Sequence, residues 1–500
     1  MAEAAIETTR LRGTTSRLCL TAESDALRKK ALAALFDFGN KRSVSTTMNF
    51  RLRGFELPSE ALILLSFVVL IAAGTLVLSL PACHAGPRLP LVDTLFTITS
   101  AACVTGLVVA DTGTHFTRLG QAVIVLVIQL GGLGIITLSS FFAILMGKRM
   151  PLKQQDIVRQ TYSSLDPRSF RLLVGRIVLF TLGIEAIGAL ILFFVWRKEF
   201  PLGLAVWQSL FHAVSAFCNA GFSLFRTNMI AYQTNAVVTL TIAFLIILGG
   251  IGFLVIYDLE RLLRYRNCRL SLHSKLALLT STFLIVGGTA VFFLLERENV
   301  LKGLGFPHQI LVSFFQAVVP RTAGFNSIDY AKVTASTMVF TMLLMFIGGS
   351  PGSTAGGVKT TTLALFLANA YSLSRGQTST NILNRTVPDK SVNEARAVIL
   401  VAITLMLIFN FTLQWTETGF TPHQQAPASF IETSFETVSA FATVGLSAGL
   451  TPKLTTWGKI QIILLMLIGR VGPLTVAVMI ARTQRGVTQF EYYRENVMVG

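Results

Sequence analysis

The chain has 500 residues, of which 52% are hydrophobic and only 13% are charged, and its mean hydropathy is +0.64. Soluble domains carry about 25% charged residues, so this composition excludes an ordinary soluble fold. Several uncharged runs reach the roughly 20 residues that a helix needs to cross a bilayer, whereas an outer-membrane barrel would show short alternating strands. The composition therefore predicts an all-α membrane protein.

The net charge of +17 follows the predicted topology. Most of the 42 Lys and Arg residues lie before the first span, after the last span, or in the connections on that same side. Because positive residues mark the cytoplasmic side, we expect a multi-pass protein of the cell membrane with both termini in the cytoplasm. Membrane lipid is then an expected partner, and nucleic acid is not.

Residues 1–60 are polar and carry no signal-peptide pattern, which predicts a cytoplasmic N-terminal tail. The chain has five cysteines and no CxxC pair, so we expect free thiols rather than disulfides or a zinc site.

Four similar segments follow in the chain, each between two long apolar spans. Each begins at an aromatic residue and ends at a glycine, and these glycines are Gly106, Gly221, Gly324 and Gly445. The repeated unit is span, half-helix, glycine loop and span. The four pore repeats are predicted at 61–147, 172–261, 275–371 and 396–482, followed by a cytoplasmic tail at 483–500.

The predicted outer spans are 61–82, 172–196, 275–296 and 396–416. The predicted inner spans are 118–147, 233–261, 336–371 and 457–482. Eight crossings and four re-entrant loops result.

A half-helix and a loop inside a membrane are tolerated only where their backbone lines a water-filled or ion-filled path. Four such loops around one axis predict a pore. The negative C-terminal end of each half-helix favours a cation, and glycine lets backbone carbonyls turn inward to replace the water shell of that cation. The alternative is that the glycines only allow helices to pack closely.

The third inner span contains a segment too rich in Gly and Pro to continue a helix. Its residues are Gly348, Gly349, Ser350, Pro351, Gly352, Ser353, Thr354, Ala355, Gly356 and Gly357. We expect a flexible loop at membrane depth, directly below the third glycine loop; a simple kink is the alternative.

Arg470 stands alone in the last span, with long uncharged runs on both sides. A charge near the bilayer centre is costly, so Arg470 should face the pore or pair with an acid, and Glu185 is a possible partner. Arg321 is expected to brace the third loop by bonding to an acid or a carbonyl behind it. His212 is expected to make a buried polar contact. Solvated positions at the outer rim are expected for Asp111, Asp329, Glu432 and Glu436.

The four loops resemble the filters of the Ktr/Trk/HKT superfamily of potassium transporters, and the resemblance covers about residues 60–500. The matching filter residues are Val104, Thr105, Gly106, Asn219, Ala220, Gly221, Thr322, Ala323, Gly324, Thr443, Val444 and Gly445. Within the superfamily the chain is most similar to the KtrB membrane subunits, because it lacks the extra span pair of the Trk branch.

The resemblance implies potassium uptake through a four-filter pore, with potassium held only by backbone carbonyls. It also implies that residues 348–357 form an intramembrane gating loop with Arg470 beside it. A homodimer and a cytoplasmic nucleotide-binding ring of the KtrA type are implied as partners. Sodium is implied as a coupling ion or an activator, and no bound cofactor is expected.

Two other function classes are less well supported by the sequence. A sodium-coupled transporter with alternating access also uses broken helices, but it pairs them across its halves, whereas only one inner span here shows a long glycine break. An enzyme is not expected, because the chain has no P-loop or HExxH motif.

Overall fold

The computed structural model describes residues 59–134, 167–265, 269–377, 379–422 and 428–472. The predicted tails lie outside this range, apart from Ser59 and Glu60, and so do the last parts of the predicted first and fourth inner spans. The chain divides into two compact units. One holds Tyr257–Ser271, in which Ser271 donates a 2.7 Å hydrogen bond to Asp258, and the other holds the remaining described residues.

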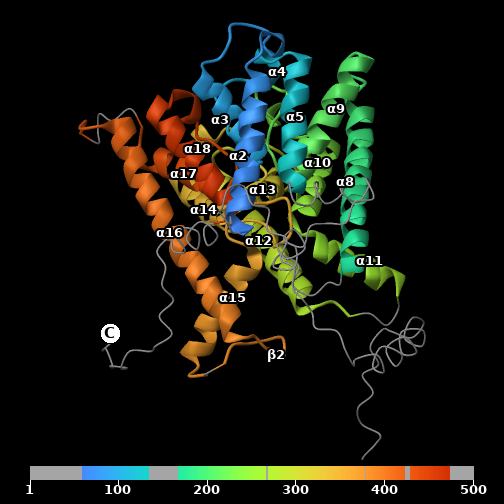
Figure 1. The fold of residues 1–500 in the computed structure, drawn as a ribbon, viewed down its shortest axis with the longest axis vertical. Helices are drawn as coiled ribbons and strands as arrows, with labels where there is room; N and C mark the ends of the chain where they lie inside the picture. Colours follow the sequence, from blue (N-terminus) through green and yellow to red (C-terminus); the bar gives the residue numbers. More distant parts are fainter. Residues whose placement is uncertain (1–58, 135–166, 266–268, 378, 423–427, 473–500) are drawn as a thin grey trace, which may run out of the picture. The chain divides into compact units, whose positions relative to one another are not determined.

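The second unit is built almost entirely from α-helices (Figure 1). The outer helices are α2 (Ser59–Leu78), α8 (Pro167–Trp196), α12 (Leu272–Glu296) and α16 (Asp389–Thr418). The half-helices are α3 (Leu91–Ala102), α9 (Leu202–Phe217), α13 (Phe306–Val318) and α17 (Phe430–Phe441). The inner helices are α5 (Arg118–Leu133), α10 (Ala236–Gly250), α14 (Ala335–Phe346) and α18 (Thr456–Val471).

Smaller elements complete the described chain. They are the helices α4 (Thr112–His115), α11 (Phe253–Arg264) and α15 (Thr360–Ser374), and four 3-10 turns at Pro81–Cys83, Ile230–Tyr232, Tyr330–Lys332 and Thr451–Lys453. Strands β1 (Asn381–Ile382) and β2 (Arg385–Thr386) form an antiparallel hairpin with Asn381 opposite Thr386. The sequence analysis did not anticipate this hairpin.

Each inner helix begins at a side chain that caps its first turn. Thr117, Asn235, Thr334 and Thr455 each accept a hydrogen bond from the backbone N–H three residues later. The caps fix where the inner helices start, at the end of the turn that follows each glycine loop.

The inner helices are shorter than the spans predicted from sequence. Helices α5, α10 and α18 end next to Gly134, Gly252 and Gly472, whose φ angles are 78°, 96° and 103°. A positive φ cannot continue an α-helix, and glycine adopts it without the strain that a side chain would cause, so glycine ends the helix. By length and composition, α8, α12 and α16 are each able to cross a membrane, and α10 with α11 is a bent fourth candidate among the described residues.

The second inner span departs from its prediction. It was expected to run unbroken over 233–261, but α10 ends at Gly250 and α11 begins at Phe253. The third inner span breaks as expected, because α14 ends at Phe346 and α15 begins at Thr360. Within the residues that the structure describes, the second and third inner spans are therefore both interrupted, whereas only the third was expected to be.

Successive repeats pack on one another in the same way. Each inner helix contacts the half-helix of the next repeat: α5 packs on α9, α10 on α13, and α14 on α17. The last inner helix, α18, packs on α3, so the series of contacts closes on itself (Figure 1). The aromatic residues that begin each repeated segment are fully buried in this packing: Phe96, Phe211, Phe315 and Phe435.

Candidate functional site

The four glycine loops, at 104–106, 219–221, 322–324 and 443–445, share one unusual backbone conformation. The first residue of each loop has a positive φ, and these residues are Val104 (56°), Asn219 (60°), Thr322 (68°) and Thr443 (51°). The glycines also have positive φ, at 97° for Gly106, 69° for Gly221, 70° for Gly324 and 89° for Gly445. Non-glycine residues rarely adopt positive φ, so four repetitions of the pattern identify a conformation that the fold imposes.

The loops meet at their glycines. A Cβ atom added to Gly445 would lie 1.9 Å from the carbonyl oxygen of Thr105, and one added to Gly106 would lie 2.5 Å from that of Ala220. The same addition at Gly324 would meet the carbonyl oxygen of Val444 at 2.6 Å. On Gly221 it would lie 2.6 Å from the Cα of Gly324. The predicted filter residues, although far apart in sequence, are thus brought together.

In each loop, the carbonyl oxygen of the middle residue lies at this meeting point and takes no part in the hydrogen bonds that hold the fold together. The carbonyl oxygens of Thr105, Ala220, Ala323 and Val444 accept no hydrogen bond from any residue that the structure describes. The hydroxyls of Thr105, Thr322 and Thr443 are buried and likewise have no partner within the described chain. Backbone carbonyls are normally paired, so four free ones around one point form a ring of oxygen ligands suited to a dehydrated cation.

Hydrogen bonds from the half-helices hold three loops in the same way. The N–H of the middle residue donates to the carbonyl of a serine five residues earlier, at 2.7–2.8 Å, in the pairs Thr105–Ser100, Ala220–Ser215 and Val444–Ser439. In the third repeat the stretch from the aromatic residue to the glycine is one residue shorter, and there Ala323 N–H donates to the carbonyl of Val319, four residues earlier, at 3.0 Å. The half-helices end directly before the loops, so their partial negative charges point at the carbonyl ring.

A cavity of about 400 Å³ opens above the ring, and we call it the vestibule. All four glycines line it, together with Asp111 and Asp329. These two acids cap short helices, and their partly exposed carboxylates add negative charge to the cavity.

The other predicted outer residues separate into two groups. Glu432 is partly exposed and forms a capping box with Ser429 at the start of α17. Glu436, expected at the solvated rim, is instead fully buried beside the fourth loop. His212 is fully buried and hydrogen-bonded, as expected.

Arg321 was expected to bond to an acid or a carbonyl, and this was wrong. Its Nη2 donates to the hydroxyl of Ser281 on α12 at 2.8 Å, and the side chain is only 7% exposed. The guanidinium points away from the carbonyl ring into the packing between the third loop and its outer helix. It therefore ties the loop to α12 without placing a positive charge among the carbonyls.

The loop at 348–357 packs against the broken end of α10. Ser350 N–H donates to the carbonyl of Gly250 at 2.9 Å, and Thr354 N–H donates to that of Gly249 at 3.2 Å. In return, Phe253 N–H donates to the carbonyl of Gly352 at 2.9 Å. The break in the second inner span and the loop in the third thus form hydrogen bonds with each other. The backbone N–H and C=O groups left unpaired in one are satisfied by those of the other.

The same loop also touches the second half-helix and the fourth glycine loop. The hydroxyl of Thr354 donates to the carbonyl of Phe217, at the end of α9, at 3.3 Å. A Cβ on Gly356 would lie 2.0 Å from the hydroxyl oxygen of Thr443 in the fourth glycine loop. The loop was expected below the third glycine loop, and it in fact contacts the second and fourth repeats.

Arg470 bonds to backbone rather than to an acid. It donates to the carbonyl of Thr354 in the 348–357 loop and to the carbonyl of Gly131 at the end of α5. Glu185, the suggested partner, instead accepts a 3.3 Å hydrogen bond from Gln129 and makes no ion pair with Arg470. Arg470 therefore connects three repeats, and Lys359 adds a second cation by donating to Ala355 at 2.8 Å.

A second repeated motif was missed in the sequence. The inner helices end in Gly131–Gly134, Gly249–Gly252 and Gly469–Gly472, with a glycine at both ends of each segment. A Cβ at Gly131, Gly249 or Gly469 would lie within 2.0 Å of the carbonyl oxygen that ends the half-helix of its own repeat. Aligning these three segments with one another shows that Arg470 occupies the place of the second glycine, Gly132 or Gly250, of the other two.

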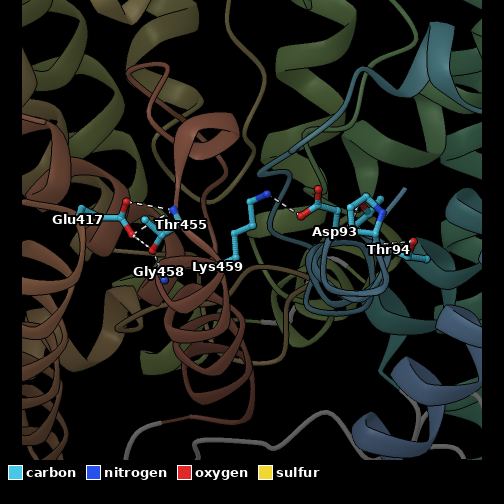
Figure 2. A network of polar contacts seen from close by, with 8 residues as sticks. Asp93, Thr94, Glu417, Thr455, Gly458 and Lys459 are labelled. Carbon is cyan, nitrogen blue, oxygen red and sulfur yellow. Dashed lines mark hydrogen bonds and ion pairs between the residues drawn. The ribbon is translucent and has the colours of Figure 1, made fainter. Parts of the chain in front are cut away.

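The first and last repeats are joined by a largely buried ion pair (Figure 2). Lys459 on α18 donates to Asp93 in the first turn of α3 at 2.6 Å, and the side chains are only 14% and 16% exposed. Figure 2 also shows Glu417, in the last turn of α16, which accepts hydrogen bonds from the backbone N–H and the hydroxyl of Thr455, the N-cap of α18. The pair closes the cycle of repeats.

We expect Lys459→Met to lower the free energy of unfolding by about 2 kcal/mol, because it leaves Asp93 without its cation in a mostly buried place. Thermal unfolding of the detergent-purified protein measures this. The double variant Asp93→Asn with Lys459→Met should recover part of the loss. Lys332→Met is the matched control, because its ion pair with Asp329 is exposed and 3.8 Å long. Equal losses in Lys459→Met and Lys332→Met would contradict the role given to the buried pair.

A histidine pair lies in the outer connections of the first repeat. The rings of His84 and His115 are 5.6 Å apart, and Phe116 packs on both of them. Burial lowers the pKa of His84 below its ordinary value of 6.5, and the nearby His115 and Arg88 lower it further.

Because the folded state holds His84 neutral, its contribution to stability is complete above pH 6.5 and is lost as the pH falls below that value. We expect the unfolding temperature in detergent to drop between pH 7.5 and 5.0, and His84→Gln to drop less. The same pH dependence in both proteins would show that His84 is not responsible.

Comparison with known proteins places this geometry in context. The profile of the TrkH family, described as cation transport protein, matches residues 56–486. The chain is 41% identical to the Ktr system potassium uptake protein B of Bacillus subtilis, over 84% of this chain and 92% of that protein. It is 38% identical to the potassium/sodium uptake protein NtpJ of Enterococcus hirae, over 91% and 100%. The crystal structure of the potassium transporter TrkH from Vibrio parahaemolyticus has the same fold, with a TM-score of 0.68, 18% identity, and coverage of 91% of this chain and 89% of that one.

Proposed function

Because the chain belongs to the TrkH family of cation transport proteins, we propose that it takes up potassium across the cell membrane through one pore formed by its four repeats. The observation that carries the proposal is the meeting of four glycine loops with unpaired carbonyls at the ends of four half-helices. Potassium sheds its water at this ring, because the carbonyl oxygens replace its hydration shell. The twelve residues at 104–106, 219–221, 322–324 and 443–445 form the selectivity filter.

The 348–357 loop is the gate. It lies against the glycine loops, and the hydrogen bonds that hold it run to α10 and to Arg470, so a small rearrangement of these contacts frees it. Arg470 holds the gate closed by bonding to Thr354, and its fixed charge raises the barrier to cations. Both effects act on the same side of the filter.

The proposal also covers how the protein assembles and how its uptake is regulated. The name of the Bacillus subtilis relative assigns it to a Ktr system, and we propose that this chain likewise works as a homodimer with a cytoplasmic nucleotide-binding ring of the KtrA type. Its termini and the hairpin β1–β2 would then face the cytoplasm. Sodium couples to or activates uptake, an idea supported by the potassium/sodium uptake named for the Enterococcus hirae relative. The protein needs no bound cofactor and is not an enzyme.

A sodium-coupled carrier with alternating access is the second candidate. It is favoured by one observation, the interruption of the second inner span beside that of the third, since such carriers pair broken helices. Unitary currents separate the two mechanisms. A pore gives resolvable single-channel currents, whereas a carrier gives only the far slower flux of a conformational cycle.

The experiment that tests the proposed function is rescue of a potassium-uptake-deficient cell at low external potassium. The chain is expressed with and without a KtrA-type subunit, and growth and uptake are measured with and without sodium. We expect growth that depends on potassium and is increased by sodium and by the subunit. No rescue under any of these conditions, with the protein present in the membrane, would contradict potassium uptake.

A further inference from the structure

Three of the four repeats share a polar contact behind the glycine loop that the first repeat lacks. In the second, third and fourth repeats a serine follows shortly after the glycine, and a polar side chain on the half-helix bonds to it. The pairs are His212–Ser223, Gln316–Ser327 and Glu436–Ser447. We call these pairs the loop braces.

In the second repeat, the other hydrogen bond of His212 determines which atom of the brace donates and which accepts. Nδ1–H of His212 donates to the carbonyl of Gln208 at 2.7 Å, so Nε2 of the neutral ring is left to accept. It accepts from the hydroxyl of Ser223, 2.9 Å away, and from Leu224 N–H at 3.3 Å. Ser223 oxygen in turn accepts from Phe225 N–H at 3.0 Å, which ties three consecutive residues to the half-helix.

In the third repeat an amide makes the contact. Gln316 Nε2 donates to the hydroxyl oxygen of Ser327 at 3.0 Å, and its Oε1 accepts from the hydroxyl of Tyr330 at 2.7 Å. Both Gln316 and Ser327 are only 1% exposed.

In the fourth repeat the contact is made by Glu436, the buried acid that sequence reasoning placed at the rim. One oxygen accepts from the hydroxyl of Ser447, and the other accepts from that of Thr451 at 2.8 Å. Ser447 oxygen also accepts from Gly449 N–H at 2.9 Å. Three different side chains therefore do the same task at one structural position.

The first repeat has no such brace. Thr97 stands at the matching place on α3, and its hydroxyl donates to the carbonyl of Asp93 within its own helix at 2.8 Å. The residue two positions after Gly106 is Val108, which cannot form a hydrogen bond through its side chain. The chain just after the glycine is thus tied to the half-helix through a serine side chain in three repeats but not in the first. There the Ser100 hydroxyl accepts from the N–H of Gly106 itself at 3.0 Å, and Gln121 Nε2 donates to the carbonyls of Gly113 and Phe116.

We propose that Ser223, Ser327 and Ser447 are specificity-determining positions, each fixed by its half-helix partner, and that the first loop is the compliant quarter of the filter. The inference rests on the proposed function. In the size-based account of selectivity, preference for potassium requires that the carbonyl ring does not contract around the smaller sodium ion. The braces resist contraction because they hold the segment directly after each glycine, and Ser223 and Ser447 line the vestibule at that place.

The test compares Ser223→Ala, Ser327→Ala and Ser447→Ala with Val108→Ala, which truncates the same position in the unbraced repeat. The apparent KM for potassium and for sodium, and the maximal rates, are measured in an uptake-deficient cell. We expect each serine variant to lower the potassium-to-sodium preference by roughly fivefold, the effect of one lost hydrogen bond, and Val108→Ala to leave it unchanged. The preference is a ratio, so it does not depend on the amount of protein in the membrane.

A second pair of variants separates positioning from simple stability. Glu436→Gln should retain the preference, because the chain itself uses glutamine for this task in the third repeat, whereas Glu436→Leu should lower it. If both variants lose stability but keep the preference, or if Ser447→Ala behaves like Val108→Ala while Gly445→Ser loses selectivity, the braces do not determine specificity. If Gly445→Ser also keeps wild-type selectivity, the filter itself is wrongly assigned and the proposed function fails with it.

Discussion

Gly445→Ser is expected to raise the apparent KM for potassium by roughly tenfold or more and to weaken the preference for potassium over sodium. Gly445 has a φ of 89°, and its Cβ would lie 1.9 Å from the carbonyl oxygen of Thr105. The positive φ alone costs a side chain about 1–3 kcal/mol, and the close approach displaces a carbonyl of the ring. Potassium and sodium uptake kinetics in an uptake-deficient cell measure the effect.

The same change at Gly106, Gly221 and Gly324 should act in the same direction, because each added Cβ meets a backbone atom at 2.5–2.6 Å. Gly303→Ser is the matched control. Gly303 has a φ of 88°, but no atom lies within 4 Å of its added Cβ. It carries the same backbone strain without touching the ring, so its selectivity should stay at the wild-type value. Wild-type uptake and selectivity in all four filter variants would show that the filter is wrongly assigned.

Deleting Ser350–Ala355 is expected to raise the maximal uptake rate several-fold and to reduce its dependence on the cytoplasmic subunit. The deletion removes the hydrogen bonds from Ser350 and Thr354 to α10 and the contact of Thr354 with Arg470. Each such bond contributes about 1 kcal/mol, so together they are within the range that a bound partner can bias. Uptake rates with and without a KtrA-type subunit measure the result.

The potassium-to-sodium preference serves as the internal control for the deletion, because the carbonyl ring is left in place and should keep its selectivity. Arg470→Ala tests the gate independently, since it removes the hydrogen bonds to the carbonyls of Thr354 and Gly131 without shortening the chain. We expect it to raise uptake in the absence of the subunit. A well-folded deletion protein with reduced flux would instead make the 348–357 loop part of the conduction path.

The sequence by itself determined the features that depend on local composition and repetition. The apolar runs indicated the helices, and the recurring glycine placed the four loops. The half-helices, however, begin five to nine residues before the aromatic residue at which they were expected to start. The break after Phe346 was also readable, because Gly and Pro cannot continue a helix whatever surrounds them. The motif ending at Gly252 was equally local, yet it was overlooked because one glycine-rich turn does not stand out in an apolar run.

Only the tertiary structure decided which groups the buried polar residues contact. Glu436 looked like a rim charge, but the return of the chain after Gly445 covers it and supplies two hydroxyl donors. Arg470 was expected to face the pore or pair with an acid, yet it bonds to backbone carbonyls of Thr354 in the 348–357 loop and of Gly131 at the end of α5. Arg321 found a serine on a neighbouring helix. In each case the partner lies outside the residue's own helix. Because buried polar groups are hydrogen-bonded, the sequence indicates that a partner exists but not which residue it is.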